Sequence, residues 1–490
     1  MENLLDFFSD MWYTETVNNN SKGNAMKLNY KRTILVGFAF FLISAFWQAY
    51  DAIVPLILTN HFGLPQTASG TVMSIDNVLA VFLLPIFGAL SDKVNTKYGK
   101  RTPFIFFGAI LAMIAFVCLT FVDNYQLALI TEAGIPALEA VASSETAAAE
   151  AALKLTLENP LPLVGFIATL LVVLLAMATF RSPAVALMPD VTVKPLRSKG
   201  NAVINLMGTA GGILVLVLGM VFATSKHHYM QYTPYVIAVV AIMATGLVVF
   251  LISVKETKWA DEMEAESIAL GLEDVVAETD GEDKRKLSKG ELGSLLLILA
   301  SVALWYIGYN SITSKYSVYA TNILGFDFNF TLIIAQAAAI VSYIPVGMIA
   351  SKVGRRKTIL AGVAMLAAAF AIGIFIEPTT PEFIMFPVFI LAGMGWATIN
   401  VNSFPMVVEL AKGGDVGKYT GYYYTASMAA QIVAPILSGF LYDVLGMRYT
   451  FFTFGAVFVA FSFVTMFFVK HGDAKPLVKR SALENLDIDD

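Results

Sequence analysis

Hydrophobic stretches long enough to cross a bilayer recur from one end of the chain to the other. A transmembrane helix needs about 20 consecutive, mainly apolar residues. We predict twelve such helices, at residues 33–60, 67–91, 101–122, 161–189, 199–223, 233–254, 292–321, 329–351, 356–377, 382–410, 417–442 and 448–469. The pattern predicts an all-α integral membrane protein, because a helix satisfies its own backbone polar groups in lipid.

Lys and Arg are distributed unevenly over the connecting segments. If the N-terminus is cytoplasmic, the segments on that side hold 27 of the 32 Lys and Arg, whereas the opposite loops hold only Lys154, Lys226 and Arg448. Cytoplasmic loops carry such an excess of positive charge. We therefore expect a multi-pass protein of the plasma (inner) membrane with both termini in the cytoplasm. Composition agrees with a lipid environment, since 57% of the residues are hydrophobic and 14% are charged.

Two long polar loops divide the chain. Residues 123–160 are rich in alanine and acidic residues, and we expect them outside the membrane as a surface helix or a mobile loop. Residues 255–291 are highly charged, which is typical of a linker. The predicted organisation is a cytoplasmic tail, a six-helix bundle, the cytoplasmic linker, a second six-helix bundle and a cytoplasmic tail, at residues 1–32, 33–254, 255–291, 292–470 and 471–490.

The two predicted bundles repeat each other. Gly88 and Gly347 lie 259 positions apart, as do Asp51 and Asn310. The fourth and tenth helices end in the acidic residues Asp190 and Glu409, which are only 219 positions apart. The difference from 259 matches the length of the extra loop at 123–160. A duplicated unit with one insertion explains both offsets.

The loop after the second helix carries a motif that is suited to a conformational latch. Gly88 allows two helices to approach, and an acidic residue at a helix end can accept bonds from the N-terminal amides of a neighbouring helix. The basic residues that follow can pair with carboxylates of other helices. We expect a cytoplasmic gate made of Gly88, Asp92, Lys93, Arg101, Asp190, Arg355, Arg356 and Glu409. A plain positive-inside loop is the alternative. The second latch should be weaker, because Ser351 stands where the first half has Asp92.

These residues resemble the signature of the major facilitator superfamily. Ser91-Asp92-Lys93, followed by Gly99 to Ile105, is similar to the sucrose–proton symporters and to the glycoside–pentoside–hexuronide cation symporters. The stretches from Arg181 to Asp190 and from Lys199 to Ala202 match as well. The tract from Tyr50 to Pro55 lies where the related animal sugar transporters carry an intramembrane acid. The resemblance implies two pseudo-symmetric six-helix bundles, a sugar or glycoside (sucrose-like) as substrate, rocker-type alternating access and a monomer.

Ionisable residues inside membrane helices are functional candidates by default. Asp51 and Asp76 each lie about nine residues from the outer end of their helix, roughly 14 Å deep at 1.5 Å per residue. A desolvated carboxylate favours its protonated form, so we expect proton coupling at Asp51 and Asp76. Sodium stays possible, because Asn77 and Gln48 offer oxygen ligands. Helix–helix bonding by either Asp is the alternative.

Two basic residues also lie within predicted helices. Arg181 could bind a sugar hydroxyl, a substrate carboxylate or a coupling carboxylate, or form an ion pair near the cytoplasmic end. Lys315 could instead snorkel towards the membrane surface.

Aromatic and amide side chains inside the helices fit a polyhydroxylated solute. Sugars are bound by planar polar groups and by aromatic faces, and transporter sites lie near the midplane between repeats. The candidate substrate residues are Trp47, Gln48, Asn77, Asn205, Tyr306, Tyr309, Asn310, Trp396, Asn400, Asn402, Tyr423 and Gln431. Any single aromatic could serve packing or the interfacial belt instead. A passive transporter, an exporter of another solute and a non-transporting nutrient receptor remain alternative functions.

Several functional classes lack support in the sequence. The single cysteine, Cys118, excludes an internal disulfide, and the four histidines show no metal-ligand spacing. No phosphate-binding loop or nucleophile motif occurs. We therefore expect no enzyme activity, no metal, no cofactor other than the coupling ion, and no nucleic-acid partner.

Overall fold

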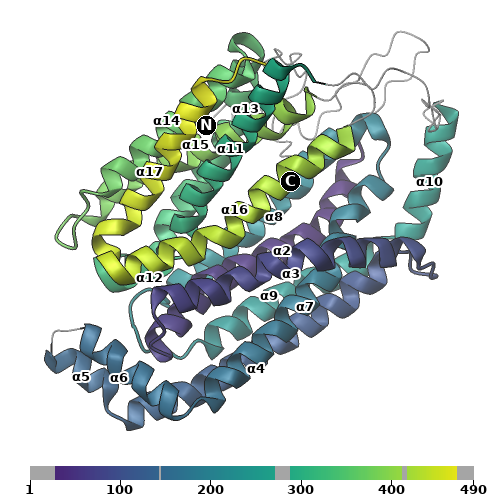
Figure 1. Cartoon of the computed structure of the whole chain (residues 1–490). Coiled ribbons are helices and arrows are strands. Elements are labelled where there is room, and N and C mark those ends of the chain that lie inside the picture. Colours follow the sequence, from purple (N-terminus) through teal and green to yellow (C-terminus); the bar gives the residue numbers. More distant parts are fainter. Residues whose placement is uncertain (1–27, 143–144, 271–286, 411–415, 472–490) are drawn as a thin grey trace.

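A computed structural model describes residues 28–142, 145–270, 287–410 and 416–471, and these residues form helices and short connections (Figure 1). The long helices of the first half are α2 (Tyr30–Leu56), α3 (Gln66–Lys93), α4 (Thr102–Glu132), α7 (Leu161–Asp190), α8 (Arg197–Val221) and α9 (Thr233–Ser253). Those of the second half are α11 (Lys289–Thr313), α13 (Phe328–Val353), α14 (Arg355–Gly373), α15 (Met385–Val408), α16 (Val416–Leu445) and α17 (Met447–Phe467).

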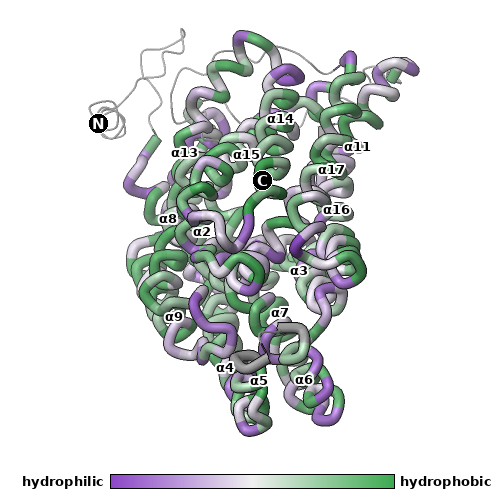
Figure 2. Tube along the Cα trace, turned by 90° about the vertical axis from the view of Figure 1, so that its left-hand side faces the viewer, coloured by the Kyte–Doolittle hydropathy of each residue, from purple (hydrophilic) through white to green (hydrophobic). Residues whose placement is uncertain are grey.

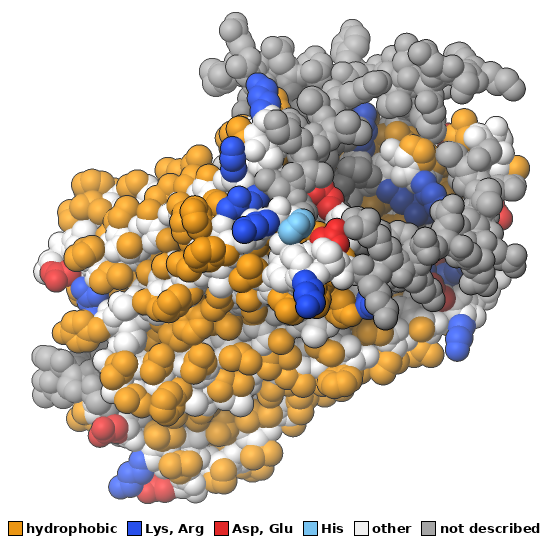
Figure 3. Space-filling model, turned by 45° about the horizontal axis from the view of Figure 1, so that its top comes forward, with side chains coloured by type: hydrophobic (Ala, Val, Ile, Leu, Met, Phe, Trp, Pro, Cys, Tyr) orange, Lys and Arg blue, Asp and Glu red, His pale blue; other side chains and the backbone are white. Residues whose placement is uncertain are grey.

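The long helices have the length and composition of membrane spans. Among the described residues, eleven helices are long and apolar enough to cross a bilayer, and α13 adds the apolar stretch Phe328–Tyr343. Figure 2 shows hydrophobic residues along the long helices that it labels. Figure 3 shows hydrophobic side chains covering the flank of the molecule. The predicted all-α membrane fold is confirmed.

The helices form two bundles that meet along two seams. In Figure 1 the purple-to-blue first half lies below the green-to-yellow second half. α3 packs against α16, and α8 packs against α13, so each half contributes one helix to each seam. Large buried side chains such as Tyr50, Phe116 and Trp305 belong to one continuous hydrophobic core.

The extra segment of the first half is helical. α4 continues to Glu132, ten residues beyond its predicted end. Gln126 and Ile130 are buried against the segment that follows, and Asp123 is buried against His61. That segment forms α5 (Ile135–Ala142) and α6 (Glu145–Glu158), which protrude at the lower end of the molecule in Figure 1. We call this end of the molecule the insertion end.

The described part of the charged linker forms α10 (Glu256–Ala269) at the opposite end, which we call the linker end. Its Trp259 is buried, and the guanidinium of Arg32 lies 5.3 Å from the centre of that ring. Arg32 also forms an ion pair with Glu262. These contacts attach α10 to the first half. Several Lys and Arg side chains gather at the linker end in Figure 3.

At the insertion end the two halves are joined by polar contacts. The carboxylate of Asp443 in α16 accepts bonds from the backbone N–H groups of Gln66 and Thr67, both at 2.7 Å. It therefore caps the N-terminus of α3 in the other half. The buried Lys315 donates from Nζ to Ser69 Oγ at 2.6 Å, also across the two halves. Lys315 thus faces the interface between the halves and does not extend towards the membrane surface.

Candidate functional site

A cavity of about 940 Å³ lies between the two halves. This volume is at the upper end of the range that small-molecule sites occupy, roughly 300–1,000 Å³. Seven residues that the sequence singled out line it: Trp47, Gln48, Asp51, Arg181, Asn205, Tyr309 and Trp396. The tertiary structure therefore brings candidates from five helices, α2, α7, α8, α11 and α15, into one space.

The first-half wall of the cavity is charged. Asp51 lies on the same face of α2 as Trp47 and Gln48, because it follows them by four and three residues. Asp51 lies inside the protein, and its exposed side chain lines the cavity. Arg181 of α7 places its guanidinium 5.8 Å from the centre of the Trp47 ring. This wall therefore offers a carboxylate, a cation and an amide to a solute in the cavity.

Asp76 lies behind this wall on α3 and does not line the cavity. Its Oδ1 accepts from the backbone N–H of Asn77 at 2.6 Å and from the Asn77 side-chain amide at 2.8 Å. Its charge repels that of Asp51 and is attracted by Arg181. The three predicted coupling residues therefore form one electrostatic group.

The second-half wall is aromatic. The rings of Tyr309 and Trp396 stack with centres 3.7 Å apart and planes 4° apart. Tyr306 meets the same indole edge-on, with ring centres 5.3 Å apart and an interplanar angle of 85°. Tyr309 and Trp396 line the cavity, whereas Tyr306 contacts Trp396 without lining it. The stacked pair holds a flat apolar surface in place.

Other predicted substrate residues lie outside the cavity lining in this conformation. The side-chain amides of Asn310 and Asn402 donate to carbonyl groups four residues earlier, at 2.8 and 2.9 Å. The amide of Gln431 lies 3.4 Å from the carbonyl of Ser427 in the same way. A polar side chain within a helix often satisfies itself like this. Tyr423 shares a hydrogen bond of 2.9 Å with Ser403, and the remaining members of this group are Asn77 and Asn400.

Sequence reasoning missed Gln336, which lines the cavity from α13. Its Nε2 donates to Gln48 Oε1 at 2.7 Å, so the two amides join the halves beside the cavity. Gln336 lies inside the predicted span 329–351. The rule that found the other amides within apolar helices would have included it.

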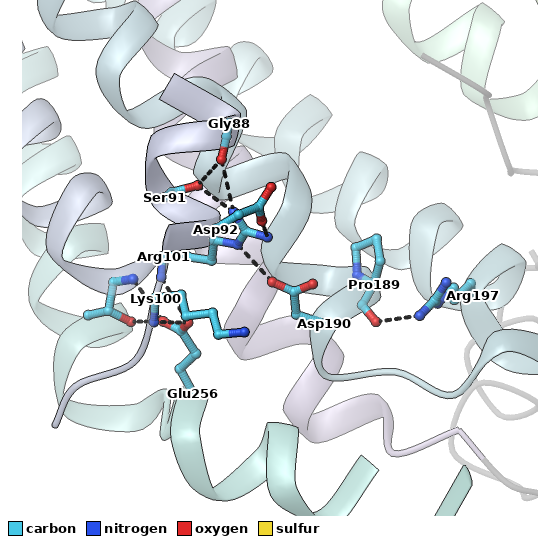
Figure 4. A network of polar contacts seen from close by, with 10 residues as sticks. Gly88, Ser91, Asp92, Lys100, Arg101, Pro189, Asp190, Arg197 and Glu256 are labelled. Atoms are coloured by element: carbon cyan, nitrogen blue, oxygen red, sulfur yellow. Dashed lines mark hydrogen bonds and ion pairs between the residues drawn. The ribbon is translucent and has the colours of Figure 1, made fainter. Parts of the chain in front are cut away.

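At the linker end, Arg101 is the centre of a polar network (Figure 4). Its Nε donates to Asp190 at 2.7 Å, and its other nitrogens bond to Asp92 and Ser91. Burial of the guanidinium lowers the pKa of Arg101, but the hydrogen bonds and charges of Asp190 and Asp92 outweigh burial and raise that pKa above its ordinary value. Arg101 therefore stays charged and ties together the ends of α3, α4 and α7.

Gly88 makes this network possible through close helix packing. A Cβ at Gly88 would lie 2.9 Å from Ser182 Oγ of α7. The Gly88 carbonyl accepts a bond of 2.7 Å from Ser91 Oγ, and Arg101 approaches the same carbonyl at 3.5 Å. Lys93 is exposed beside the network.

At the linker end, the acidic residue that accepts from the N-terminal amides of α4 is Glu256 of α10, whereas Asp92 pairs with Arg101. Glu256 receives bonds from the backbone N–H groups of Lys100, Arg101 and Thr102 at 2.6–2.8 Å. Gly99 is essential to this arrangement, because a Cβ there would lie 2.2 Å from the Glu256 carboxyl carbon. Sequence reasoning did not identify Glu256, because the charged linker contains many acidic residues.

The second half has its own ion pair at the linker end. Arg355 pairs with Glu409, and both belong to the second half. Arg356 bonds to the carbonyl of Phe467 at the end of α17, and its guanidinium lies 5.8 Å from the centre of the Phe467 ring. Asp190 and Glu409 thus each pair with an arginine of their own half, Asp190 with Arg101 and Glu409 with Arg355.

Comparison with known families and curated proteins gives a consistent result. The sequence profile of the Major Facilitator Superfamily matches residues 36–412 and 328–486. The putative glycoside/cation symporter YagG of Escherichia coli (strain K12) is 34% identical over 64 residues, which cover 13% of this chain and 14% of YagG. The uncharacterized symporter YnaJ of Bacillus subtilis (strain 168) is 32% identical over 83 residues, covering 16% and 18%. These matches therefore span less than a fifth of either relative.

Solved structures of transporters share the fold. The inward open conformation of the xylose transporter XylE from E. coli matches with a TM-score of 0.57 at 14% identity, covering 93% of this chain and 99% of XylE. A bacterial homologue of the iron transporter ferroportin in its inward-facing state matches with a TM-score of 0.62 at 11% identity, covering 90% and 98%. At these identities the likeness concerns the fold.

Proposed function

The chain belongs to the Major Facilitator Superfamily and is a transporter rather than an enzyme, and from this premise we propose that it is a proton-coupled symporter of a sugar or glycoside. The observation that carries this proposal is the chemistry of the cavity. Asp51 and Arg181 stand on one wall, and the stacked Tyr309 and Trp396 stand on the other. In this proposal, Asp51 of the first-half wall takes up the coupling ion, and the aromatic second-half wall contacts the sugar ring.

The proposed cycle uses alternating access between the two halves. Asp51 takes a proton from outside, and the sugar then binds in the cavity with its C–H face against Trp396 and its hydroxyls near Gln48 and Arg181. Contacts between the halves then form on the outer side and break on the inner side. Release of sugar and proton to the cytoplasm resets the carrier.

We place the insertion end outside and the linker end, with both termini, in the cytoplasm of a plasma (inner) membrane. The Lys and Arg distribution supports this orientation, since Lys and Arg gather at the linker end. The polar contacts between the halves at the insertion end then make this the outer-closed conformation. Two solved structures of the same fold are described as inward open or inward-facing.

The test is transport into proteoliposomes. Purified protein is given a panel of labelled sugars and glycosides under an inside-alkaline pH gradient, and accumulation is compared with the same vesicles after the gradient is collapsed. Gradient-dependent accumulation of a panel member supports the proposal. If no sugar or glycoside enters, the substrate assignment is wrong, and if entry occurs without accumulation, the protein is a passive transporter.

The coupling ion is tested in the same vesicles by replacing the pH gradient with a sodium gradient. Accumulation that follows sodium alone assigns Na⁺ as the coupling ion in place of the proton. Substrate binding without any entry would mark a receptor, because a receptor needs affinity but no turnover.

A further inference from the structure

Each half carries the same turn at the insertion end. Asn60 precedes Gly63 by three positions, as Asn322 precedes Gly325, and the two pairs are 262 positions apart. This local offset is three more than the 259 that relates Asp51 to Asn310, so the second half has three additional residues between Asn310 and its turn. Both glycines are left-handed, with φ of +64° and +70°. Each turn also contains a π-helical segment that includes its asparagine. The turns are therefore equivalent parts of the duplicated unit.

The two asparagines bind each other across the halves. Asn322 Nδ2 donates to Asn60 Oδ1 at 2.6 Å, and Asn60 Nδ2 lies 3.4 Å from Asn322 Oδ1 in return. Asn60 also donates to the carbonyl of His228 at 3.3 Å. Equivalent residues that contact each other lie on the local two-fold axis. This reciprocal pair therefore joins the halves at the insertion end.

The surroundings of the two turns differ. A Cβ at Gly63 would lie 2.4 Å from the Leu153 nitrogen and 2.5 Å from the Ala149 carbonyl oxygen of α6, whereas a Cβ at Gly325 would meet nothing within 4 Å. Only the first-half turn is thus packed directly against backbone of the inserted helix.

Side chains of the extra segment also bind the backbone of the first-half turn. Thr156 of α6 donates to the carbonyl of Phe62 at 3.0 Å. Gln126 of α4 donates to the carbonyl of His61 at 3.0 Å and to Thr156 Oγ1 at 3.0 Å. Gln126 and Thr156 are buried, so water does not compete for these bonds.

A buried hydrogen bond between His61 and Asp123 adds a third anchor. His61 Nδ1 and Asp123 Oδ1 are 2.6 Å apart, and both side chains are completely buried. The rings of Tyr232 and Tyr229 lie 5.8 and 6.4 Å from the imidazole, centre to centre. Because His61 follows Asn60 directly, fixing His61 also fixes the direction in which Asn60 points.

We infer that the segment formed by the end of α4 and by α6 holds the first-half turn as the fixed partner of the Asn60–Asn322 pair. Asp123, Gln126 and Thr156 are its positioning residues. Ordering Asn60 in advance removes part of the entropy cost of forming the pair. The extra segment therefore favours the conformation that is closed at the insertion end. This inference rests on the alternating access proposed above.

Opening of the insertion end can be measured with one cysteine. Cys118→Ser removes the only native thiol, and Thr313→Cys then places a reporter in the cavity lining at the end of α11. Intact cells are treated with a membrane-impermeant maleimide, and the labelling rate is followed. Thr156→Val in this background should raise the rate about fivefold, because Asn60 is then less ordered and the pair costs more entropy to form. Thr156→Ser keeps the hydroxyl and should label at the parent rate.

Equal labelling of Thr156→Val and Thr156→Ser would overturn the inference. Asn322→Ala serves as the positive control, because it removes the pair itself and should label at least as fast as Thr156→Val. Labelling requires no substrate. A failed sugar assignment therefore leaves this test intact, and a failed labelling test leaves the sugar assignment intact.

A matched pair of glycine variants tests the difference between the turns directly. Asparagine tolerates the left-handed conformation, so Gly63→Asn and Gly325→Asn carry similar backbone strain. Only Gly63→Asn collides with α6, and it should label several times faster than Gly325→Asn. Equal rates for both variants would refute a special role of the extra segment. If Gly63→Asn does not fold, the two Thr156 variants decide.

Discussion

The two halves surround one cavity but bring different chemistry to it. The first half supplies Asp51 and Arg181, whereas the second half supplies the Tyr309–Trp396 stack. The residue equivalent to Asp51 is Asn310, whose amide is turned back to the carbonyl of Tyr306 in its own helix. The two halves thus share a helical framework, whereas the charged side chains that line the cavity, Asp51 and Arg181, belong to the first half. Under the proposed function, ion response and sugar contact belong to different halves and can be altered separately.

The largest expected effect comes from removing the charge of the first-half wall. Asp51→Asn should abolish accumulation of substrate under a pH gradient, because the neutral amide cannot take up a proton. Exchange of labelled for unlabelled substrate should continue. Both are measured in proteoliposomes. Asn310→Asp is the matched variant in the other half. If Asn310→Asp abolished accumulation while Asp51→Asn did not, the division of roles would be reversed.

The next effect concerns stability at the linker end of the first half. Arg101→Ala leaves Asp190 and Asp92 without their cation. We expect a loss of about 2–3 kcal/mol in unfolding free energy, below the 3–5 kcal/mol for a fully buried pair because both carboxylates are partly exposed. Thermal unfolding in detergent measures this. Lys93→Ala, at an exposed neighbour, should change stability by less than about 0.5 kcal/mol. Equal losses would show that the network stabilises nothing.

A smaller effect follows from the aromatic wall. Trp396→Ala removes the stack with Tyr309 and the surface for a sugar ring, and an aromatic contact of about 1.5 kcal/mol corresponds to about a tenfold rise in KM. Trp396→Phe keeps a flat ring and should recover most of the affinity. Initial uptake rates over a substrate series give both values. A tenfold rise in Trp396→Phe as well would point to the indole N–H instead of the ring face.

The smallest expected effect concerns the Gln48–Gln336 amide pair, which joins the two halves beside the cavity. Gln336→Leu removes the bond to Gln48 and should raise KM about threefold to tenfold, the range of a lost hydrogen bond. Ala337→Leu places the same side chain at the next, exposed position of α13 and should leave KM unchanged. If both variants raise KM alike, an added leucine on α13 explains the effect, and the amide of Gln336 makes no specific contact.

The fold was largely predictable because its signals are local. Apolar stretches of membrane-spanning length and the offset of 259 positions between equivalent residues are visible without any contact information. The helical ends were less predictable. α4 passes its predicted end at residue 122. Asp123 and Gln126 are polar in sequence, but Asp123 is buried against His61 and Gln126 against Thr156 of α6, and both contacts depend on tertiary structure.

The site was predictable in residue type and only partly in position. Trp47, Gln48 and Asp51 could be identified because polar residues within apolar helices are rare. Asn402 and Gln431 satisfied the same rule, yet their amides lie at carbonyls of their own helices. Sequence alone does not distinguish an amide that faces a cavity from one that bonds its own backbone, since rotation of the helix decides between them.

The sequence by itself determined the membrane architecture, the duplication and the set of rare intramembrane polar residues, because hydropathy and spacing act along the chain. Only the tertiary structure decided which of these residues meet. It turned Asp51 and Trp396 towards one cavity, and it set Asp443 on the N-terminus of α3. It also packed α6 against Gly63, whereas a Cβ at Gly325 would have no neighbour within 4 Å. Such pairings join positions hundreds of residues apart, and packing of whole helices is what selects them.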